Sequence, residues 1–266
     1  MPTQKQGIVF AGLMPHAPVL IPEVGRGRER EAGEVVDGMR EVSRRTLKRS
    51  PDRLILVSPH TPRVRSGFAC WGDFRICGDL GRFGAPQVKI DLPRDELIGA
   101  RLQKVCQSIR GVPLDHGASV PLYFLVEAGW NGPTTLLGLT YPGEGDVSKF
   151  GTVVKGVADE LEGRTAFIAS GDMSHALKPG APAGFNSRAH EFDEAFVASM
   201  EKGDYEGITR IDPELRELSA EDVVDSTLMA AAAVGGANSG FEFLAYQGPF
   251  GVGYSVAVMF DVSKDE

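Results

Sequence analysis

The sequence predicts an α/β fold: a single three-layer domain in which helices flank a mixed, partly parallel central sheet. Three observations support this prediction. Short apolar runs suited to strands recur along the chain, helix-like segments alternate with them, and several runs end in polar residues. The chain has 266 residues and shows no linker-like shift in composition and no internal repeat, so we expect one domain over residues 1–266.

Three apolar runs have the same pattern: each is suited to a strand and is followed by a histidine. They are residues 7–16, 53–60 and 165–175, which end at His16, His60 and His175. A continuous apolar run is typical of a strand buried on both faces. Open α/β sheets hold their chemistry beyond the carboxyl ends of the strands. We therefore expect these three ends, which carry three of the five histidines, to meet at one site.

The remaining elements follow from periodicity and from helix-start signals. Residues 28–49 carry apolar residues at helical spacing, Pro93 suits the first turn of a helix from Leu92 to about Ile109, and Ser219 begins a helix with Glu221 in its first turn. Residues 61–90 are expected to be irregular, and Pro142–Gly145 to form a turn. Further strands are expected at 134–140 and at the end of the chain after Gly248, and further helices at 147–162, 186–202 and 204–217.

Composition excludes several classes of function. The net charge of −8 leaves no basic excess to release counterions from phosphates, which disfavours nucleic-acid binding. No apolar run is long enough to cross a bilayer and no leader segment is recognisable, so we expect a cytoplasmic protein without membrane contact. The three cysteines, Cys70, Cys77 and Cys106, form no CxxC pair and indicate neither a disulfide framework nor a zinc–cysteine site.

The strand-end histidines suit a metal site or an acid/base site. His16 and His60 could converge, and a carboxylate from elsewhere would complete a two-histidine, one-carboxylate triad with open positions for Fe(II) and O₂ chemistry. A lone histidine is more often a hydrogen-bonded structural residue, but three at strand ends weaken that interpretation. The residues alone leave the metal and the acid/base interpretations open.

Four short motifs occur in order along the chain: Met14-Pro-His16-Ala-Pro, Ser58-Pro-His60, Asp115-His116-Gly117 with Val120-Pro-Leu122, and Gly171-Asp-Met-Ser-His175. Together they resemble the class III, LigB-like extradiol ring-cleavage dioxygenase superfamily. The C-terminal segment Gln247–Tyr254 is closer to its uncharacterised and Memo-like branches, and the resemblance covers essentially the whole chain.

The resemblance implies a LigB-like fold and a role for each motif histidine. His16 and His60 match the iron ligands, His175 the catalytic acid/base, and His116 a second histidine of the substrate pocket. Glu221 is the best match to the carboxylate ligand, although its surroundings lack the family's glycine, and its alternative is a first-turn glutamate favoured by the helix dipole. Asp222, Asp225 and Glu242 are the fallbacks.

The implied activity is opening of a catechol-type or aminophenol-type ring by O₂ at a non-haem Fe(II) centre, with a small aromatic diol as substrate. Zn or Mn would fit the same donors. Asp172 could orient His175 or cap the local turn. The Ala- and Gly-rich helix at about 222–234 could pack within the domain or against a second copy in a homo-oligomer.

Two rival functions remain. One is a non-catalytic Memo-like protein that binds a metal or a peptide in the same cleft. The other is a hydrolase that uses Ser174 or Ser58, which the sequence disfavours because Gly-Asp-Met-Ser-His is not a G-x-S-x-G elbow.

Overall fold

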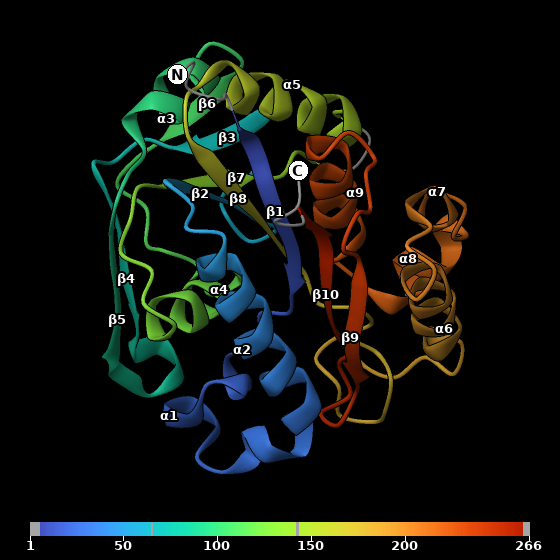
Figure 1. Ribbon diagram of the computed structural model, residues 1–266. Coiled ribbons are helices and arrows are strands. Elements are labelled where there is room, and N and C mark those ends of the chain that lie inside the picture. Colours follow the sequence, from blue (N-terminus) through green and yellow to red (C-terminus); the bar gives the residue numbers. More distant parts are fainter. Residues whose placement is uncertain (1–5, 65, 142–143, 263–266) are drawn as a thin grey trace.

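A mixed eight-stranded sheet crosses the centre of the computed structural model, which describes residues 6–64, 66–141 and 144–262 (Figure 1). The strand order is β6-β3-β7-β2-β8-β1-β10-β9, and β4 and β5 form a separate two-stranded sheet. The strands are β1 (Gly7–Met14), β2 (Arg53–Ser58), β3 (Phe68–Trp71), β4 (Arg75–Leu80), β5 (Ala85–Pro93), β6 (Cys106–Ile109), β7 (Thr134–Gly138), β8 (Arg164–Ser170), β9 (Glu242–Gln247) and β10 (Tyr254–Asp261).

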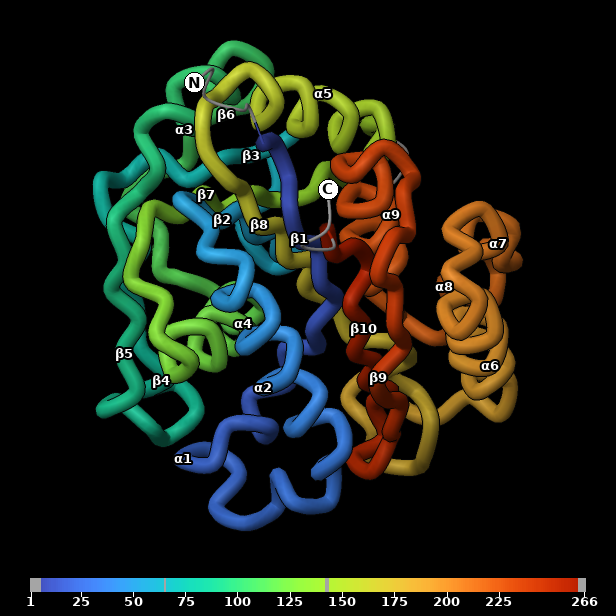
Figure 2. The backbone as a smooth tube through the Cα atoms, in the orientation of Figure 1, coloured from blue at the N-terminus to red at the C-terminus, as the bar shows by residue number. Residues whose placement is uncertain are grey.

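Helices cover both faces of this sheet and complete three layers. Figure 1 shows α2 and α4 on one side and α5 and α9 on the other, and Figure 2 shows α6, α7 and α8 as a group outside α9. This arrangement confirms the predicted fold class. The helices are α1 (Pro22–Gly25), α2 (Gly33–Lys48), α3 (Glu96–Leu102), α4 (His116–Glu127), α5 (Val147–Glu160), α6 (Ala189–Met200), α7 (Tyr205–Thr209), α8 (Pro213–Ser219) and α9 (Val224–Ala233).

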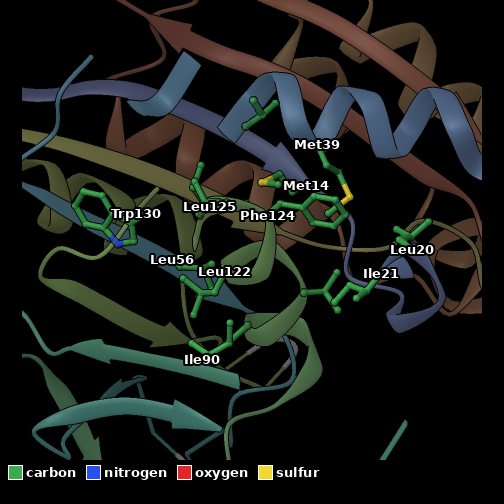
Figure 3. Close-up of a cluster of buried hydrophobic side chains, with 14 of the residues drawn as sticks. Met14, Leu20, Ile21, Met39, Leu56, Ile90, Leu122, Phe124, Leu125 and Trp130 are labelled. Atoms are coloured by element: carbon green, nitrogen blue, oxygen red, sulfur yellow. The ribbon is translucent and has the colours of Figure 1, made fainter. Parts of the chain in front are cut away.

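The central strands are apolar throughout because each of their faces is covered. In β2, Leu54 and Leu56 belong to the core beneath α2 and α4, whereas Ile55 and Val57 belong to the core beneath α5 and α9. Successive side chains of a strand point to opposite faces, so one strand supplies both cores. Figure 3 shows the first core, where Met39 lies beside Phe124 and Leu56 lies beside Leu122.

The four central strands bring the predicted strand ends together. β7, β2, β8 and β1 run parallel, with β8 paired to both β2 and β1. Figure 2 shows β1 and β8 side by side at the middle of the sheet. Parallel strands end at the same edge of the sheet, so the residues that follow β1, β2 and β8 meet there.

The sequence expectations are wrong between residues 61 and 109. The segment expected to be irregular contains β3, β4 and most of β5, and the helix expected from Leu92 is only the seven-residue α3, followed by β6. β4 is short and contains Gly78, which weakens its strand pattern. The alternation of buried Val88, Ile90 and Leu92 with exposed Lys89 and Asp91 in β5 is a strand signal that the sequence expectation missed. Asp95 caps α3 by accepting from the backbone N–H groups of Leu97 and Ile98, so that helix begins after Pro93.

Elsewhere the predicted elements are close to those observed, with three differences. The helices α1 and α4 and the strand β9 were not predicted, and the 204–217 region divides into α7 and α8. The helix expected to begin at Ser219 begins at Val224, because Ser219 is the last residue of α8. Pro142 and Gly143 of the predicted turn lie outside the described residues. Within the described ranges, no helix is both long enough and apolar enough to span a bilayer. The single-domain boundaries 1–266 stay a prediction.

Candidate metal centre

Three histidines from separate elements lie together at the carboxyl edge of the sheet. His16 and His60 each follow a strand, β1 and β2, by two residues, and His116 is the first residue of α4. One ring nitrogen of each lies within 4.8 Å of the others. The His60 and His116 rings are stacked with centroids 4.2 Å apart, and the Nε2 atoms of His16 and His60 are 3.0 Å apart.

Asp115 fixes His116 against the end of β2. Its carboxylate accepts from the Ala118 N–H at 2.9 Å and so caps α4. The same carboxylate accepts hydrogen bonds from the Ser58 and Thr61 hydroxyls at 2.6 and 2.8 Å, on either side of His60. Asp115 therefore positions two histidines. It caps the helix α4, which begins with His116, and it holds the residues on either side of His60 at the end of β2.

A carboxylate completes the group from the other side. Asp222 Oδ2 lies 3.5 Å from His16 Nε2 and 3.2 Å from His60 Nε2. Its Oδ1 accepts from the Asp172 N–H at 2.8 Å, and the Asp222 N–H donates to the Asp172 carbonyl at 3.1 Å. Gly171 makes this approach feasible, because a Cβ atom there would lie 2.4 Å from Val223 Cα.

These three atoms, His16 Nε2, His60 Nε2 and Asp222 Oδ2, form what we call the donor triangle, with edges of 3.0, 3.2 and 3.5 Å. Ligands about 2.1 Å from a metal ion that share one face of an octahedron stand about 3 Å apart. The donor triangle fits that face. It leaves the opposite face for other ligands, which is the arrangement of a two-histidine, one-carboxylate site.

The hydrogen bonds of His16 leave its Nε2 atom free to act as a ligand. The Ser170 hydroxyl donates to the Gly117 carbonyl at 2.5 Å, so it can only accept from His16 Nδ1, which is 3.0 Å away. The proton of the neutral ring therefore resides on Nδ1. An outer partner that fixes the tautomer in this way is typical of metal-binding histidines.

Electrostatics distinguish the two buried imidazoles. Burial opposes protonation of His16, but the carboxylates of Asp172 and Asp222 raise its pKa to about 9. Burial and the charges of His60 and His16 lower the pKa of His116 to about 4. Burial also opposes ionisation of Asp222, but His16 and His60 hold its pKa below the usual value. At neutral pH Asp222 is therefore ionised and His116 is neutral.

Glu221, the expected carboxylate ligand, is engaged elsewhere. Its Oε1 binds Arg216 Nε at 2.6 Å and its Oε2 accepts from the Val224 N–H at 2.9 Å, at the start of α9. The side chain is 3% exposed, and burial raises the pKa of its carboxyl group. The first-turn alternative is also inexact, because α9 begins at Val224 and Glu221 precedes it, where its carboxylate accepts from a free N–H group at the helix start. The neighbouring residue, Asp222, is the carboxylate at the histidines.

The other fallback carboxylates also lie away from the histidines. Asp225 pairs with Arg216 at 3.0 Å, and Glu242 pairs with Arg45 at 2.6 Å. Of the four carboxylates considered from the sequence, the structure brings Asp222 alone into contact with His16 and His60 among the described ion pairs.

His175 is not part of the three-imidazole group. Its backbone N–H donates to the Ser219 carbonyl at 2.7 Å, which holds it beside the segment that leads to Asp222. Its Nδ1 atom is buried without a hydrogen-bond partner among the described residues. Asp172, which could orient His175, instead accepts from the His16 N–H at 2.7 Å. Burial raises the pKa of Asp172, whereas His16 and His175 lower it.

The serine hydrolase alternative gains no support. The Ser58 hydroxyl donates to Asp115 rather than to a histidine. Ser174 is fully buried, and its hydroxyl faces the Ser219 carbonyl at 3.4 Å. Sequence reasoning missed Ser170 as a partner of His16; its signal was a hydroxyl residue at the end of the third apolar run.

Two cavities reach the donor triangle from different directions. The Arg63 cavity, about 490 Å³, reaches Asp222, and its lining includes Arg63, Leu139, Thr140, Tyr141 and Arg216. The Phe83 cavity, about 520 Å³, reaches His60 and His116, and its lining includes Pro62, Phe83, Pro113 and Leu114.

Fold and donors together define an α/β protein with a metal-type histidine–carboxylate centre at the carboxyl edge of its sheet. Residues 10–257 match the family model described as the catalytic LigB subunit of aromatic ring-opening dioxygenase. The chain belongs to this family. The group of His16, His60 and His116 could hold a metal ion.

Two comparisons place the chain among its relatives. It is 28% identical over 271 residues to Protein CA_C1420 of Clostridium acetobutylicum, an alignment that covers 95% of this chain. The chain spans 58% of that relative's length. The crystal structure of uncharacterized protein JW3007 from Escherichia coli K12 shares the fold, with a TM-score of 0.58 at 14% identity over 95% of this chain and 99% of that one.

Proposed function

We propose that this protein is a non-haem, Fe(II)-dependent extradiol dioxygenase that opens a catechol-type or aminophenol-type ring with O₂. The donor triangle carries the proposal, because its edges of 3.0, 3.2 and 3.5 Å fit one octahedral face and leave the other face for diol and O₂. His16, His60 and Asp222 would hold the ion, and Zn or Mn would suit the same atoms. A bound divalent ion lowers the pKa of a substrate hydroxyl and brings both reactants together.

The chain's own residues supply proton transfer and orientation. His175 would act as the base that takes a proton from the second hydroxyl, since histidine changes protonation near neutral pH. His116, neutral because its pKa is lowered to about 4, can donate or accept a hydrogen bond beside the donor triangle. Both oxygen atoms of O₂ enter the ring-opened product and the diol supplies the electrons, so the reaction needs no further reductant.

The proposal extends to the surroundings of the enzyme. The substrate would be a small aromatic diol, and the net charge of −8 supports the proposal that nucleic acid is not a partner. We propose a cytoplasmic protein. The Ala-rich helix α9 packs within the domain, where a Cβ atom on Gly151 of α5 would lie 2.4 Å from the Met229 carbonyl oxygen. A homo-oligomer therefore stays a proposal without an assigned surface, and size-exclusion chromatography with light scattering would give the number of copies.

The test is anaerobic Fe(II) titration followed by O₂ uptake with catechol, protocatechuate and aminophenol. We expect stoichiometric iron binding, O₂ uptake and a yellow ring-opened product. His16→Ala should lose iron, whereas His175→Ala should keep iron and lose turnover by about a hundredfold or more. His190→Ala, at an exposed histidine of α6, is the matched control and should behave as wild type.

Two outcomes would contradict the proposal. Absence of iron binding would remove the metal centre altogether. Tight iron binding without O₂ uptake from any of these compounds would favour the non-catalytic Memo-like alternative, in which the same cleft binds a metal or a peptide.

A further inference from the structure

The glycine-rich segment 247–254 pairs with the segment that carries His175. The Met173 N–H donates to the Gly253 carbonyl at 2.8 Å, and the Gly253 N–H donates to the Ser174 carbonyl at 2.8 Å. The C-terminal segment that stands out in the sequence therefore lies against the residues just before the proposed acid/base.

A buried carboxylate on α6 binds the same segment. Asp193 is 1% exposed, and its Oδ1 accepts from the Ser174 N–H at 2.9 Å. Its Oδ2 accepts from the Tyr246 hydroxyl at 2.7 Å. Burial raises the pKa of Asp193 to about 6, so this carboxylate is ionised at neutral pH. Burial and the Asp193 charge raise the pKa of Tyr246, so its hydroxyl stays protonated and donates.

Gly253 makes room for this carboxylate. A Cβ atom on Gly253 would lie 2.1 Å from Asp193 Oδ2 and 3.0 Å from Met173 Cβ. Asp193 Oδ2 is held by Tyr246, so it cannot retreat without losing that hydrogen bond. The position requires glycine because α6 and the 173–175 segment approach it closely.

The placement of the His175 ring depends on its backbone. Its Nδ1 atom is buried without a hydrogen-bond partner among the described residues. Its N–H donates to the Ser219 carbonyl at 2.7 Å, and its carbonyl accepts from the Ala183 N–H at 3.0 Å. The residue is half-buried, whereas Ser174 and Ala176 on either side are buried. A well-held segment therefore presents one partly exposed imidazole.

Loss of the Asp193 contact would leave a buried donor without a partner. Ser174 is fully buried, so water cannot replace the carboxylate at its N–H while the segment keeps its position. The segment could satisfy that N–H only by moving, and its movement would carry His175 with it. A shift of about 1 Å in a reacting group can lower a rate by about a hundredfold.

We propose that Asp193 is a positioning residue for His175, which it holds in place through the Ser174 N–H and with the space that Gly253 leaves. This inference rests on the proposed function, in which His175 takes the second substrate proton. Neither α6 nor the 247–254 segment contributes an atom to the donor triangle. The role should therefore appear in proton transfer and not in metal binding.

The first measurement needs no turnover. Nitrogen NMR of the imidazole groups, in the metal-free and the Zn(II)-loaded full chain, reports on the surroundings of each histidine, and His175→Gln assigns the His175 signal by its loss. The variants are Asp193→Ala, Asp193→Asn and Gly253→Ala. Tyr205→Phe is the matched control, because it removes another buried hydrogen bond, to the Met259 carbonyl at 2.8 Å, near the opposite end of β10 from Gly253.

We expect one sharp His175 signal in wild type, in Asp193→Asn and in Tyr205→Phe, and a doubled or broadened signal in Asp193→Ala and Gly253→Ala. Asparagine keeps the contacts, because its amide oxygen accepts from the Ser174 N–H and its NH₂ group donates to the Tyr246 oxygen.

The second measurement is turnover of the iron-loaded protein. Asp193→Ala should lower kcat by about tenfold or more, with KM and iron affinity unchanged. Asp193→Asn should remain within about threefold of wild type, because it keeps the hydrogen bond. In the His175→Ala background, Asp193→Ala should cost no further activity, since the two residues act as one unit.

An unchanged His175 signal in Asp193→Ala would overturn the positioning role. A loss in Asp193→Asn as large as in Asp193→Ala would overturn it too, because the charge rather than the hydrogen bond would then matter. So would a further loss on top of His175→Ala, which indicates general damage to the fold. Absence of turnover in wild type would reject the dioxygenase proposal alone, since the His175 signal still decides whether Asp193 positions the ring.

Discussion

The two cavities that reach the donor triangle have similar volumes and differ in their charged residues. The lining of the Phe83 cavity is mainly uncharged but includes Asp79, Arg82 and Asp115, and the Phe83 ring lies 5.6 Å from the ring of His116. The lining of the Arg63 cavity includes two arginines and four carboxylates, of which Glu221 and Asp225 share Arg216. Consecutive residues, Pro62 and Arg63, line different cavities, so the short segment after His60 divides them.

The donor triangle therefore lies between two different electrostatic environments. On the His116 side, burial and neighbouring imidazoles keep the ring neutral. On the Asp222 side, the carboxylate remains charged because it faces His16 and His60. A centre between a neutral side and a charged side can orient an unsymmetrical substrate, since only one end of the ligand matches each side.

The largest effect on metal affinity is expected from substitution of the donor residue that each cavity reaches, Asp222 or His60. Asp222→Asn and His60→Ala should each weaken Fe(II) binding by more than about a hundredfold, because each removes one corner of the donor triangle. Glu221→Gln should keep iron binding and lose about 2 kcal/mol of unfolding free energy, since it disrupts a charge-assisted contact with Arg216. Anaerobic titration and chemical denaturation measure the two quantities.

Iron binding that survives Asp222→Asn and disappears in Glu221→Gln would reverse this assignment. It would return Glu221 to the role that the sequence suggested, and would require the 221–222 segment to rotate when metal binds.

A change of pH is expected to have an intermediate effect on metal affinity, because the pKa values of His16 and His116 are shifted in opposite directions. With its pKa raised to about 9, His16 must release a proton when a metal binds at neutral pH, whereas His116, with a pKa of about 4, releases none. Metal affinity should therefore rise about tenfold per pH unit up to about pH 9. Calorimetry in buffers of different ionisation enthalpy counts the released proton.

The pH dependence of the unfolding free energy of the metal-free protein is the control for this prediction. A raised histidine pKa stabilises the fold fully below the unfolded value of 6.5, and that contribution is lost as pH rises through about 9. The free energy of unfolding should fall over this window in wild type and much less in His16→Gln. A flat profile in wild type would contradict the assigned ion pairs.

The smallest effect is expected in the Phe83 cavity. Phe83→Ala removes a ring that is 39% exposed and borders His116, and should weaken every catechol by about threefold to tenfold, whatever its substituent. Equilibrium binding of catechol and protocatechuate to the metal-loaded protein measures it. A loss confined to one of these two ligands would contradict this general role of the Phe83 ring.

Much of the site could be predicted because its residues follow the strongest elements. β1, β2 and β8 are buried on both faces, so their apolar runs are continuous, and His16 and His60 each lie two residues beyond a strand end. The strands and the helix between residues 61 and 109 could not be predicted in the same way. These strands are short or half-exposed, and pairing with distant partners, such as β3 with β7, decides their structure.

The sequence by itself determined the α/β class and the histidines at the strand ends, because burial on both faces and strand length are local properties of the chain. The tertiary structure alone decided between Glu221 and Asp222. These neighbours point to different partners, and the choice depends on Gly171, fifty positions earlier, which lets the Asp172 backbone hold Asp222 against the histidines. Close backbone approach between distant segments leaves no periodic signal, so only the packed fold specifies it.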